Sequence, residues 1–441
     1  MLDQFTKYIQ DQELFNADDK VLLAVSGGMD SVVMCELFNK AGFKFGIAHC
    51  NFKLRGDESD GDQNFVKALA DKLNVNFHTI DFETAKIAEE RKISTQMAAR
   101  DLRYEWFEKI LKENTYKFIA TAHHKDDQVE TLLINLLRGT GIAGLHGILP
   151  KQKNLIRPML EFSRDHIEKY VLEHSIKFRE DSSNASDKYL RNKIRHQLVP
   201  ILEEMKSGSI ETIHDNILRF RDAELIYQKQ IQQVKNELLV KEGKYWTISI
   251  PKLQEFDPIS TYLYELLKDF GFSFSQCEDI LTNIEGIAGK KFRSESHELL
   301  KDRDSLIIRM ISEVPKNETL SLGLDEITAP IKLKLKKIRK TSDFRISRSP
   351  DLVQFDSSQI SFPLQLRKWK NGDKFYPLGC TYKKKVSDFF IDKKVNLFEK
   401  ENAYVLCSGE DIIWVIGYQI DNRFRIRPET SEMLQIEFVK D

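Results

Sequence analysis

The chain has 441 residues and nearly balanced charge, with 67 Lys and Arg against 68 Asp and Glu, giving a formal net charge of −1. Hydrophobic residues make up 41% and charged residues 31%, a composition typical of a soluble globular protein of two or three domains. The balance excludes nucleic-acid binding by a global positive field, so any such binding must use local basic patches. Because no apolar run approaches the roughly 20 residues that span a bilayer, we expect no membrane segment.

Cysteine spacing indicates the compartment. The five cysteines are scattered and none belongs to a C-x-x-C pair: Cys35, Cys50, Cys277, Cys380 and Cys407. This spacing does not match a metal site, and it favours buried thiols in a reducing, cytoplasmic environment.

The first part of the chain alternates strands and helices. Val21–Val25 has five apolar residues, as expected of a strand buried on both faces. Further strands are expected at 45–49, 77–82 and 118–122, with helices at 65–73 and 96–111 among them. This rhythm predicts a Rossmann-like parallel sheet with helices on both faces. Ligands of such sheets bind beyond the carboxyl ends of the strands, so the residues that follow three of these strands should converge on one crevice.

From about Pro200 the pattern changes. Helical periodicity prevails at 211–237 and 261–281, with one short strand at 245–250. After Pro315 strands prevail, at 331–338, 362–369, 403–407, 412–417 and 434–439. We therefore divide the chain into an α/β domain at 1–205, a helical middle domain at 206–318 and a small α+β, strand-rich C-terminal domain at 319–441.

The loop after the first strand reads Ser26-Gly27-Gly28-Met29-Asp30-Ser31 and opens a helix. Two glycines allow a bound group to approach the backbone, and a helix N-terminus favours phosphate. The loop lacks the lysine of the G-x-x-x-x-G-K-[ST] P-loop. It resembles instead the S-G-G-x-D-S signature of the PP-loop ATP pyrophosphatases, which cleave ATP between its α- and β-phosphates. The alternative is an ordinary strand-turn-helix connection.

Two further segments could complete a nucleotide site. His49 ends the second strand, where adenine and ribose contacts are expected, although a polar surface loop explains it equally well. Arg100 and Arg103 stand three apart on a predicted helix and share a face, so they could hold phosphate. Exposed helix arginines are the alternative for this pair.

The segment His123-His124-Lys125-Asp126-Asp127 opens another helix, which also carries Glu130. Acidic residues at a helix N-terminus are favourable as simple caps. Three acids beside two histidines exceed what capping needs, so Asp127 and Glu130 could hold Mg²⁺ or a substrate ammonium. A zinc site is not expected, because H-E-x-x-H is missing.

Basic residues gather in two later places. Arg191, Lys193 and Arg195 lie on a predicted basic helix, which by itself reads as a solvated surface. Near the C-terminus, Trp369 and the run Lys383-Lys384-Lys385 fit a surface that grips phosphates and stacks unpaired bases, as RNA-binding surfaces do.

In this order, the segments resemble the tRNA(Ile)-lysidine synthase family, part of the PP-loop superfamily. The likeness covers nearly the whole chain. It rests on residues 26–31, 51–59, 96–104, 123–128, 157–158, 181–184, 191–195, 372–373, 384–385, 388–390 and 417–423. One departure is Cys50-Asn51-Phe52, where many members carry a second histidine after the Asn.

The resemblance implies a tRNA-processing ligase that uses ATP and Mg²⁺. The C2 oxygen of the wobble cytidine in the CAU anticodon of tRNA(Ile) would be adenylated, and free L-lysine would then attack C2. The products are lysidine, AMP and pyrophosphate, and the tRNA changes from methionine to isoleucine specificity. A homodimer is one arrangement that the sequence leaves open.

The resemblance also implies roles for the singled-out residues. Residues 26–31 would cradle the phosphates, with Asp30 near Mg²⁺. The catalytic residues would be Asp30, Asp127 and Glu130. Asp127 and Glu130 would also hold the substrate lysine. ATP contacts would come from Ser26, Gly27, Gly28, Asp30, Ser31, His49, Arg100 and His123. Arg191 and Arg195 would contact lysine carboxylate, phosphate or tRNA. The tRNA contacts would include Lys193, Trp369, Lys383, Lys384 and Lys385.

Two other functions share some of these sequence features. A PP-loop tRNA cytidine thiolase also adenylates C2 but needs persulfide cysteines or an iron–sulfur site, and no cysteine here has a partner in sequence. A tRNA-binding module with an idle ATP site would have no use for Asp30, Asp127 and Glu130 together.

Overall fold

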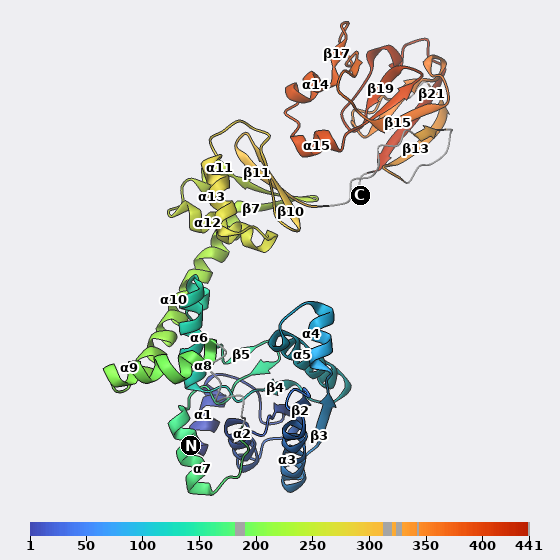
Figure 1. Cartoon of the computed structure of the whole chain (residues 1–441). Helices are drawn as coiled ribbons and strands as arrows, with labels where there is room; N and C mark the ends of the chain where they lie inside the picture. The colour runs from blue at the N-terminus through green and yellow to red at the C-terminus, as the bar shows by residue number, and fades with distance from the viewer. Residues whose placement is uncertain (181–189, 312–319, 323–328, 342–343, 440–441) are drawn as a thin grey trace. The chain divides into compact units, whose positions relative to one another are not determined.

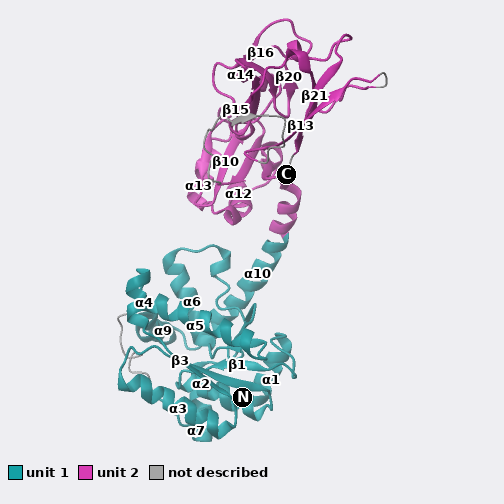
Figure 2. Ribbon diagram, turned by 90° about the vertical axis from the view of Figure 1, so that its right-hand side faces the viewer, with its two compact units in different colours: residues 1–229 teal, residues 230–441 magenta. Residues whose placement is uncertain are grey.

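Figure 1 shows the computed structural model, which describes residues 1–180, 190–311, 320–322, 329–341 and 344–439. The chain forms two compact units, residues 1–229 and 230–441 (Figure 2). The finer division at 205 and 318 remains a prediction. Among the described residues, no helix is long and apolar enough to cross a membrane.

A six-stranded, mostly parallel sheet organises the N-terminal unit, as the sequence predicts. Its strand order is β3-β2-β1-β4-β6-β5, and only β5 runs antiparallel, against β6. The strands are β1 (Val21–Ala24), β2 (Phe45–Asn51), β3 (Phe77–Asp81), β4 (Phe118–Ala120), β5 (Lys151–Gln152) and β6 (Leu155–Ile156).

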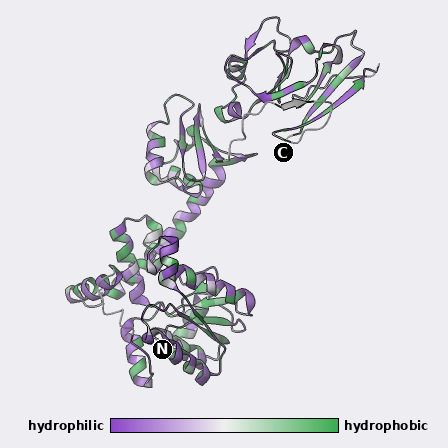
Figure 3. Ribbon diagram, turned by 45° about the vertical axis from the view of Figure 1, so that its right-hand side comes forward, coloured by the Kyte–Doolittle hydropathy of each residue, from purple (hydrophilic) through white to green (hydrophobic). Residues whose placement is uncertain are grey.

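The central strands of the sheet are buried on both faces, and the side chains of β1 alternate between two cores. Val21 and Leu23 pack with α1, α2, α3 and α7, whereas Leu22 packs with α5. All three are fully buried, which explains why β1 lacks polar residues (Figure 3). The helices of this unit are α1 (Leu2–Asp11), α2 (Met29–Lys40), α3 (Asp57–Leu73), α4 (Thr84–Arg91), α5 (Thr95–Glu113), α6 (Lys125–Arg138), α7 (Arg164–His174), α8 (Leu190–Lys193) and α9 (Val199–Met205).

Helix α10 (Ser209–Leu238) begins in the N-terminal unit and ends in the second, and it confirms the helix expected at 211–237. The middle segment that follows contains more strand than the sequence pattern indicates. Its sheet has the antiparallel order β7-β8-β11-β10-β9. The elements are β7 (Leu239–Glu242), β8 (Tyr245–Ser249), α11 (Ile250–Leu253), α12 (Ile259–Leu267), α13 (Phe274–Thr282), β9 (Lys291–Arg293), β10 (His297–Asp302) and β11 (Ser305–Met310).

The sequence conceals the β10–β11 hairpin because its turn lacks the usual signal. The β10–β11 hairpin turns at Arg303 and Asp304, and Arg303 adopts a positive φ of 32° where Asn or Gly is typical. The single helix expected at 261–281 is instead two helices, because Gly271, with φ of 80°, ends the first one.

The last part is rich in strands, as expected, and all five predicted strands are present. One sheet has the order β12-β15-β18-β19-β20, a second β13-β21-β14, and β16 pairs with β17. The elements are β12 (Leu320–Leu322), β13 (Lys332–Arg339), β14 (Leu352–Asp356), β15 (Leu364–Lys368), β16 (Lys374–Phe375), β17 (Lys384–Lys385), α14 (Val386–Asp392), α15 (Leu397–Glu401), β18 (Tyr404–Ser408), β19 (Asp411–Val415), β20 (Gln419–Ile420) and β21 (Glu432–Val439).

The core of the N-terminal unit makes a stability prediction. Phe38 on α2 is fully buried, and its ring lies 5.5 Å from that of Phe5 and 5.6 Å from that of Phe15. Phe38→Ala should lower the free energy of unfolding by about 3–5 kcal/mol, measured by urea denaturation. The control Met205→Ala removes a side chain that is 78% exposed and should cost less than about 0.5 kcal/mol. Equal effects of the two variants would contradict this packing.

Candidate functional site

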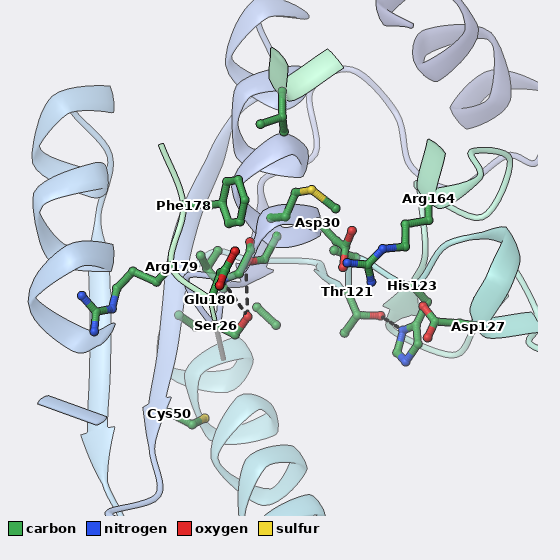
Figure 4. Close-up of a pocket in the computed structure, with 18 of the residues that line it drawn as sticks. Ser26, Asp30, Cys50, Thr121, His123, Asp127, Arg164, Phe178, Arg179 and Glu180 are labelled. Atoms are coloured by element: carbon green, nitrogen blue, oxygen red, sulfur yellow. Dashed lines mark hydrogen bonds between the residues drawn. The ribbon is translucent and has the colours of Figure 1, made fainter. Parts of the chain in front are cut away.

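A cavity of about 820 Å³ opens at the carboxyl ends of β1, β2 and β4 (Figure 4). Its wall includes Ser26 after β1, Cys50 in β2 and His123 after β4. The convergence predicted for the ends of these strands is therefore confirmed. A concave site at this edge of a parallel sheet is where the fold class binds its ligands.

The loop between β1 and α2 is held by its own hydrogen bonds. The Ser31 hydroxyl donates to the Gly28 carbonyl at 2.8 Å, and the Gly28 N–H donates to the Ser26 Oγ at 3.2 Å. Gly27 has φ of 98°, which a side chain would disfavour. The N-terminus of α2 thus faces the cavity with the hydroxyls of Ser26 and Ser31 beside it, an arrangement that suits phosphate.

His124 lies at the centre of a cluster of carboxylates. Its side chain is 3% exposed, and its Nε2 lies 3.6 Å from Asp127 Oδ2 and 3.9 Å from Asp30 Oδ2. Its Nδ1 lies 3.3 Å from Asp126 Oδ2. Burial alone would lower the pKa of His124, but the carboxylates, Asp127 first, outweigh burial and raise it to about 9. His124 is therefore an imidazolium at neutral pH.

Asp127 is both a helix cap and part of the cavity wall. Its Oδ2 accepts the backbone N–H of His124 at 3.0 Å, which caps α6. Burial opposes the ionised form, yet the nearby His124, His123 and Arg191 lower the pKa of Asp127 to about 2. Capping and a binding role, alternatives for this residue in the sequence, are therefore compatible.

The other two acids of α6, Asp126 and Glu130, make contacts that stabilise the surrounding structure. Asp126 Oδ2 accepts the backbone N–H of Arg164 at 2.9 Å, which ties α6 to the start of α7. Glu130 has a side chain only 1% exposed, and it accepts Arg191 Nε at 2.9 Å and Arg195 Nε at 2.6 Å. Glu130 lies behind the cavity wall, whereas Arg195 lines the cavity and reaches Asp127 Oδ1 at 3.4 Å.

Asp30 has an oxygen that a cation could use. Burial raises the pKa of Asp30 even though the charges of His124 and Arg164 oppose the shift. Its Oδ1 is buried without a hydrogen-bond partner, and Figure 4 shows the Arg164 side chain reaching towards it. Among the residues that the structure describes, no three His, Cys, Asp or Glu side chains are arranged to hold a metal. Asp30 therefore fits Mg²⁺ only if ATP oxygens and water supply the other ligands.

Some predicted contacts lie outside the cavity wall. His49 is buried beneath the loop, where its Nδ1 is hydrogen-bonded to the Val25 carbonyl at 2.9 Å and burial lowers its pKa. Arg100 is exposed and lies over the Tyr104 ring at 5.1 Å, whereas Arg103 lines the cavity. Their direct contacts to ATP remain predictions.

Sequence reasoning missed several residues of the wall, among them Glu168, Arg164, Phe178, Arg179 and Glu180. The last three immediately precede residues 181–184, a segment of the family resemblance that lies outside the described residues. That proximity was the signal that could have found them.

The predicted tRNA contacts are exposed or partly exposed. Lys193 is exposed on α8. In the second unit, Trp369 lines a cavity of about 900 Å³ that also includes Lys368 and Lys400. Lys383 and Lys385 are exposed, and Lys384 pairs with Asp392. Their contact with RNA remains a prediction.

All five cysteines are free thiols. Cys50 lines the cavity, but burial raises its pKa to about 12. Such a thiol is a poor nucleophile at neutral pH, and this does not favour sulfur transfer.

The sequence matches three family models: a PP-loop domain at residues 1–202, a TilS substrate binding domain at 241–311 and a TilS substrate C-terminal domain at 364–437. The tRNA(Ile)-lysidine synthase of Bacteroides thetaiotaomicron is 40% identical over 433 residues, 98% of either chain. That of Parabacteroides distasonis is 40% identical over 443 residues, the whole of both chains. Among solved structures, the U34-tRNA thiolase NcsA from Methanococcus maripaludis matches 49% of this chain and 78% of its own, at 19% identity and a TM-score of 0.42.

The buried position of Glu130 leads us to predict an effect of its substitution on stability. Glu130→Gln keeps the shape of the side chain but removes the carboxylate that Arg191 and Arg195 share, leaving Arg195 with Asp127 alone. We expect the free energy of unfolding to fall by about 1–3 kcal/mol, measured by urea denaturation. The control Glu168→Gln removes a surface partner of Arg164, with side chains 46% and 48% exposed, and should cost less than about 1 kcal/mol. Similar losses in both variants would contradict a structural role for Glu130.

Proposed function

The chain belongs to the tRNA(Ile)-lysidine synthase family, and from that membership we propose how the cavity of its N-terminal unit carries out an ATP-dependent ligation on tRNA(Ile). The observation that supports the proposal is that two parts of the same cavity suit two different substrates. The loop from Ser26 to Ser31 suits the phosphates of ATP, and Asp127 with Arg195 suits an amino acid a short distance away. A ligation of this kind needs both ATP and lysine within reach of the same nucleobase of the tRNA.

The first step activates the cytosine of the wobble nucleotide. The C2 oxygen of the wobble cytidine attacks the α-phosphorus of ATP, the bond to the β-phosphate breaks, and pyrophosphate leaves. The N–H groups at the start of α2 and the two hydroxyls of the loop would stabilise the charge on the phosphates. A Mg²⁺ ion held by Asp30 together with phosphate oxygens would supply further positive charge there.

The second step forms the carbon–nitrogen bond. The lysine ammonium first gives one proton to water, and the free ε-amine then attacks C2. AMP leaves with the original oxygen, and the nitrogen gives its second proton to water. Free lysine is an ammonium, with a pKa of about 10.4, so a site must first bind the charged form. We assign this binding to Asp127, because a carboxyl with a pKa of about 2 stays ionised. Arg195 would pair with the lysine carboxylate or with AMP, and Glu130 with Arg191 would hold Arg195 in place.

The remaining assignments concern partners. The matches to two TilS substrate domains support contact between the second unit and tRNA, for which Trp369 and Lys383 to Lys385 are the candidates. Arg191 and Lys193 could add contacts near the cavity. A homodimer and a cytoplasmic location stay predictions from the sequence.

The reaction is tested directly with ATP, Mg²⁺, radiolabelled lysine and an isoleucine tRNA bearing a CAU anticodon. We expect label in acid-precipitated RNA that survives mild alkaline deacylation, because lysidine is not an ester. Asp30→Ala should abolish the label. Absence of stable label from the folded, tRNA-bound protein would contradict lysine transfer.

The lysine site is tested by Asp127→Asn. Loss of the carboxylate should raise the KM for lysine about tenfold or more, while ATP-dependent pyrophosphate release on tRNA continues. Asp165→Asn is the control, because this acid is exposed at the start of α7. An unchanged KM for lysine, or equal loss of pyrophosphate release, would contradict the assignment.

A further inference from the structure

A short segment from Phe178 to Glu180 passes beside the phosphate loop in the N-terminal unit. The backbone N–H of Arg179 donates to the Gly27 carbonyl at 3.0 Å. Figure 4 shows all three residues along one stretch, with Glu180 next to Ser26. The segment therefore holds the loop from outside, in addition to the hydrogen bonds within the loop.

This hydrogen bond fixes the orientation of one peptide group. In a trans peptide the carbonyl and the next N–H point in opposite directions. With its carbonyl held by Arg179, the Gly27–Gly28 peptide directs its N–H away from the segment, to the Ser26 Oγ at 3.2 Å. Glycine on both sides lets this peptide rotate easily, since Gly27 has φ of 98° and neither residue has a Cβ. The contact with Arg179 adds a restraint from outside the loop on the orientation of this N–H.

The side chain of Arg179 anchors this restraint and is directed away from Ser26 and Asp30 in Figure 4. Its Nε donates to Asp62 Oδ1 at 2.5 Å. Asp62 lies on α3, is 7% exposed, and its other oxygen accepts Arg55 at 2.9 Å. A buried carboxylate shared by two guanidiniums is a strong and directional contact. The guanidinium of Arg179 is therefore paired with Asp62, although Arg179 is also one of the residues that line the cavity.

Gly61 supports the same arrangement. It lies within α3, where glycine is unfavourable because of its backbone freedom. A Cβ at this position would lie 3.0 Å from one terminal nitrogen of Arg179 and 3.4 Å from its Cζ. The absence of a side chain lets the guanidinium lie close against the helix, beside Asp62.

We propose that Asp62 is a positioning residue for ATP: through Arg179 it holds the Gly27–Gly28 peptide so that the Gly28 N–H keeps the Ser26 hydroxyl at the cavity wall, where the phosphates would bind. The idea rests on the proposed function only in taking ATP as the ligand of the loop. Asp62 touches no substrate in this account. Removing its charge frees Arg179, and the peptide then loses its preferred orientation.

The test measures ATP affinity by calorimetry, without tRNA or lysine, on the full chain. Asp62→Asn should raise the Kd for ATP roughly tenfold, as loss of a charge-assisted hydrogen bond would. In steady state the KM for ATP should rise likewise, with the KM for lysine unchanged. The control Asp71→Asn makes the same chemical change at an exposed position of α3 and should alter neither constant.

Two further variants separate positioning from folding. Gly61→Ala should keep or raise the melting temperature, because alanine favours the helix, yet weaken ATP binding by crowding Arg179. Arg179→Lys should bind ATP better than Arg179→Met, since it keeps one donor for Asp62.

Three results would overturn the proposal. One is a lower melting temperature in Asp62→Asn with an ATP Kd within twofold of the parent. A second is unchanged ATP binding in Gly61→Ala. A third is a much larger loss in Arg179→Met than in Asp62→Asn, which would make Arg179 itself the phosphate ligand. If the parent protein binds ATP but transfers no lysine, the proposed function fails while the role of Asp62 stands.

Discussion

The buried imidazolium of His124 is the interaction on which the site depends. Asp30, Asp126 and Asp127 come from two helices and all lie within 3.9 Å of its ring nitrogens. Without a positive charge among them, these carboxylates would repel one another and take up protons. With it, α2 and α6 can place acids at the same edge of the sheet, and Asp126 remains free to anchor α7. The charge of His124 therefore joins α2 to α6, and Asp126 joins α6 to α7.

The acidic residues around His124 form two layers, one that faces the cavity and one that lies behind it. Asp30 and Asp127 face the cavity, where ATP and lysine would meet. Behind them, Glu130 joins Arg191 and Arg195, and Asp62 joins Arg55 and Arg179. Each buried acid of this second layer is shared by two arginines, so one guanidinium is held in place while the carboxylate is fully paired. The family reaction requires opposite charges close together, and this layering provides them without leaving a buried charge alone.

The sequence predicted the sheet because the apolar strands and the residues that follow them are local signals. It also predicted that the loop, His123 and Asp127 would meet in one cavity, because each follows a strand of the sheet. It could not show that Glu130 faces Arg191 and not the cavity, because helix periodicity does not say what packs on each face. Nor could it pair Asp62 with Arg179, which are 117 positions apart. The β10–β11 hairpin was missed since Arg303 replaces the usual turn residues.

The most direct test of this account is the charge of His124. Its raised pKa means that its contribution to stability is complete below about pH 6.5 and is lost as the pH rises through about 9. We would titrate the imidazole signals of the isotopically labelled protein by NMR and assign His124 from the signal missing in His124→Asn. We expect an imidazolium that persists through pH 8 and titrates near 9. A His124 that is neutral at pH 7 would contradict it.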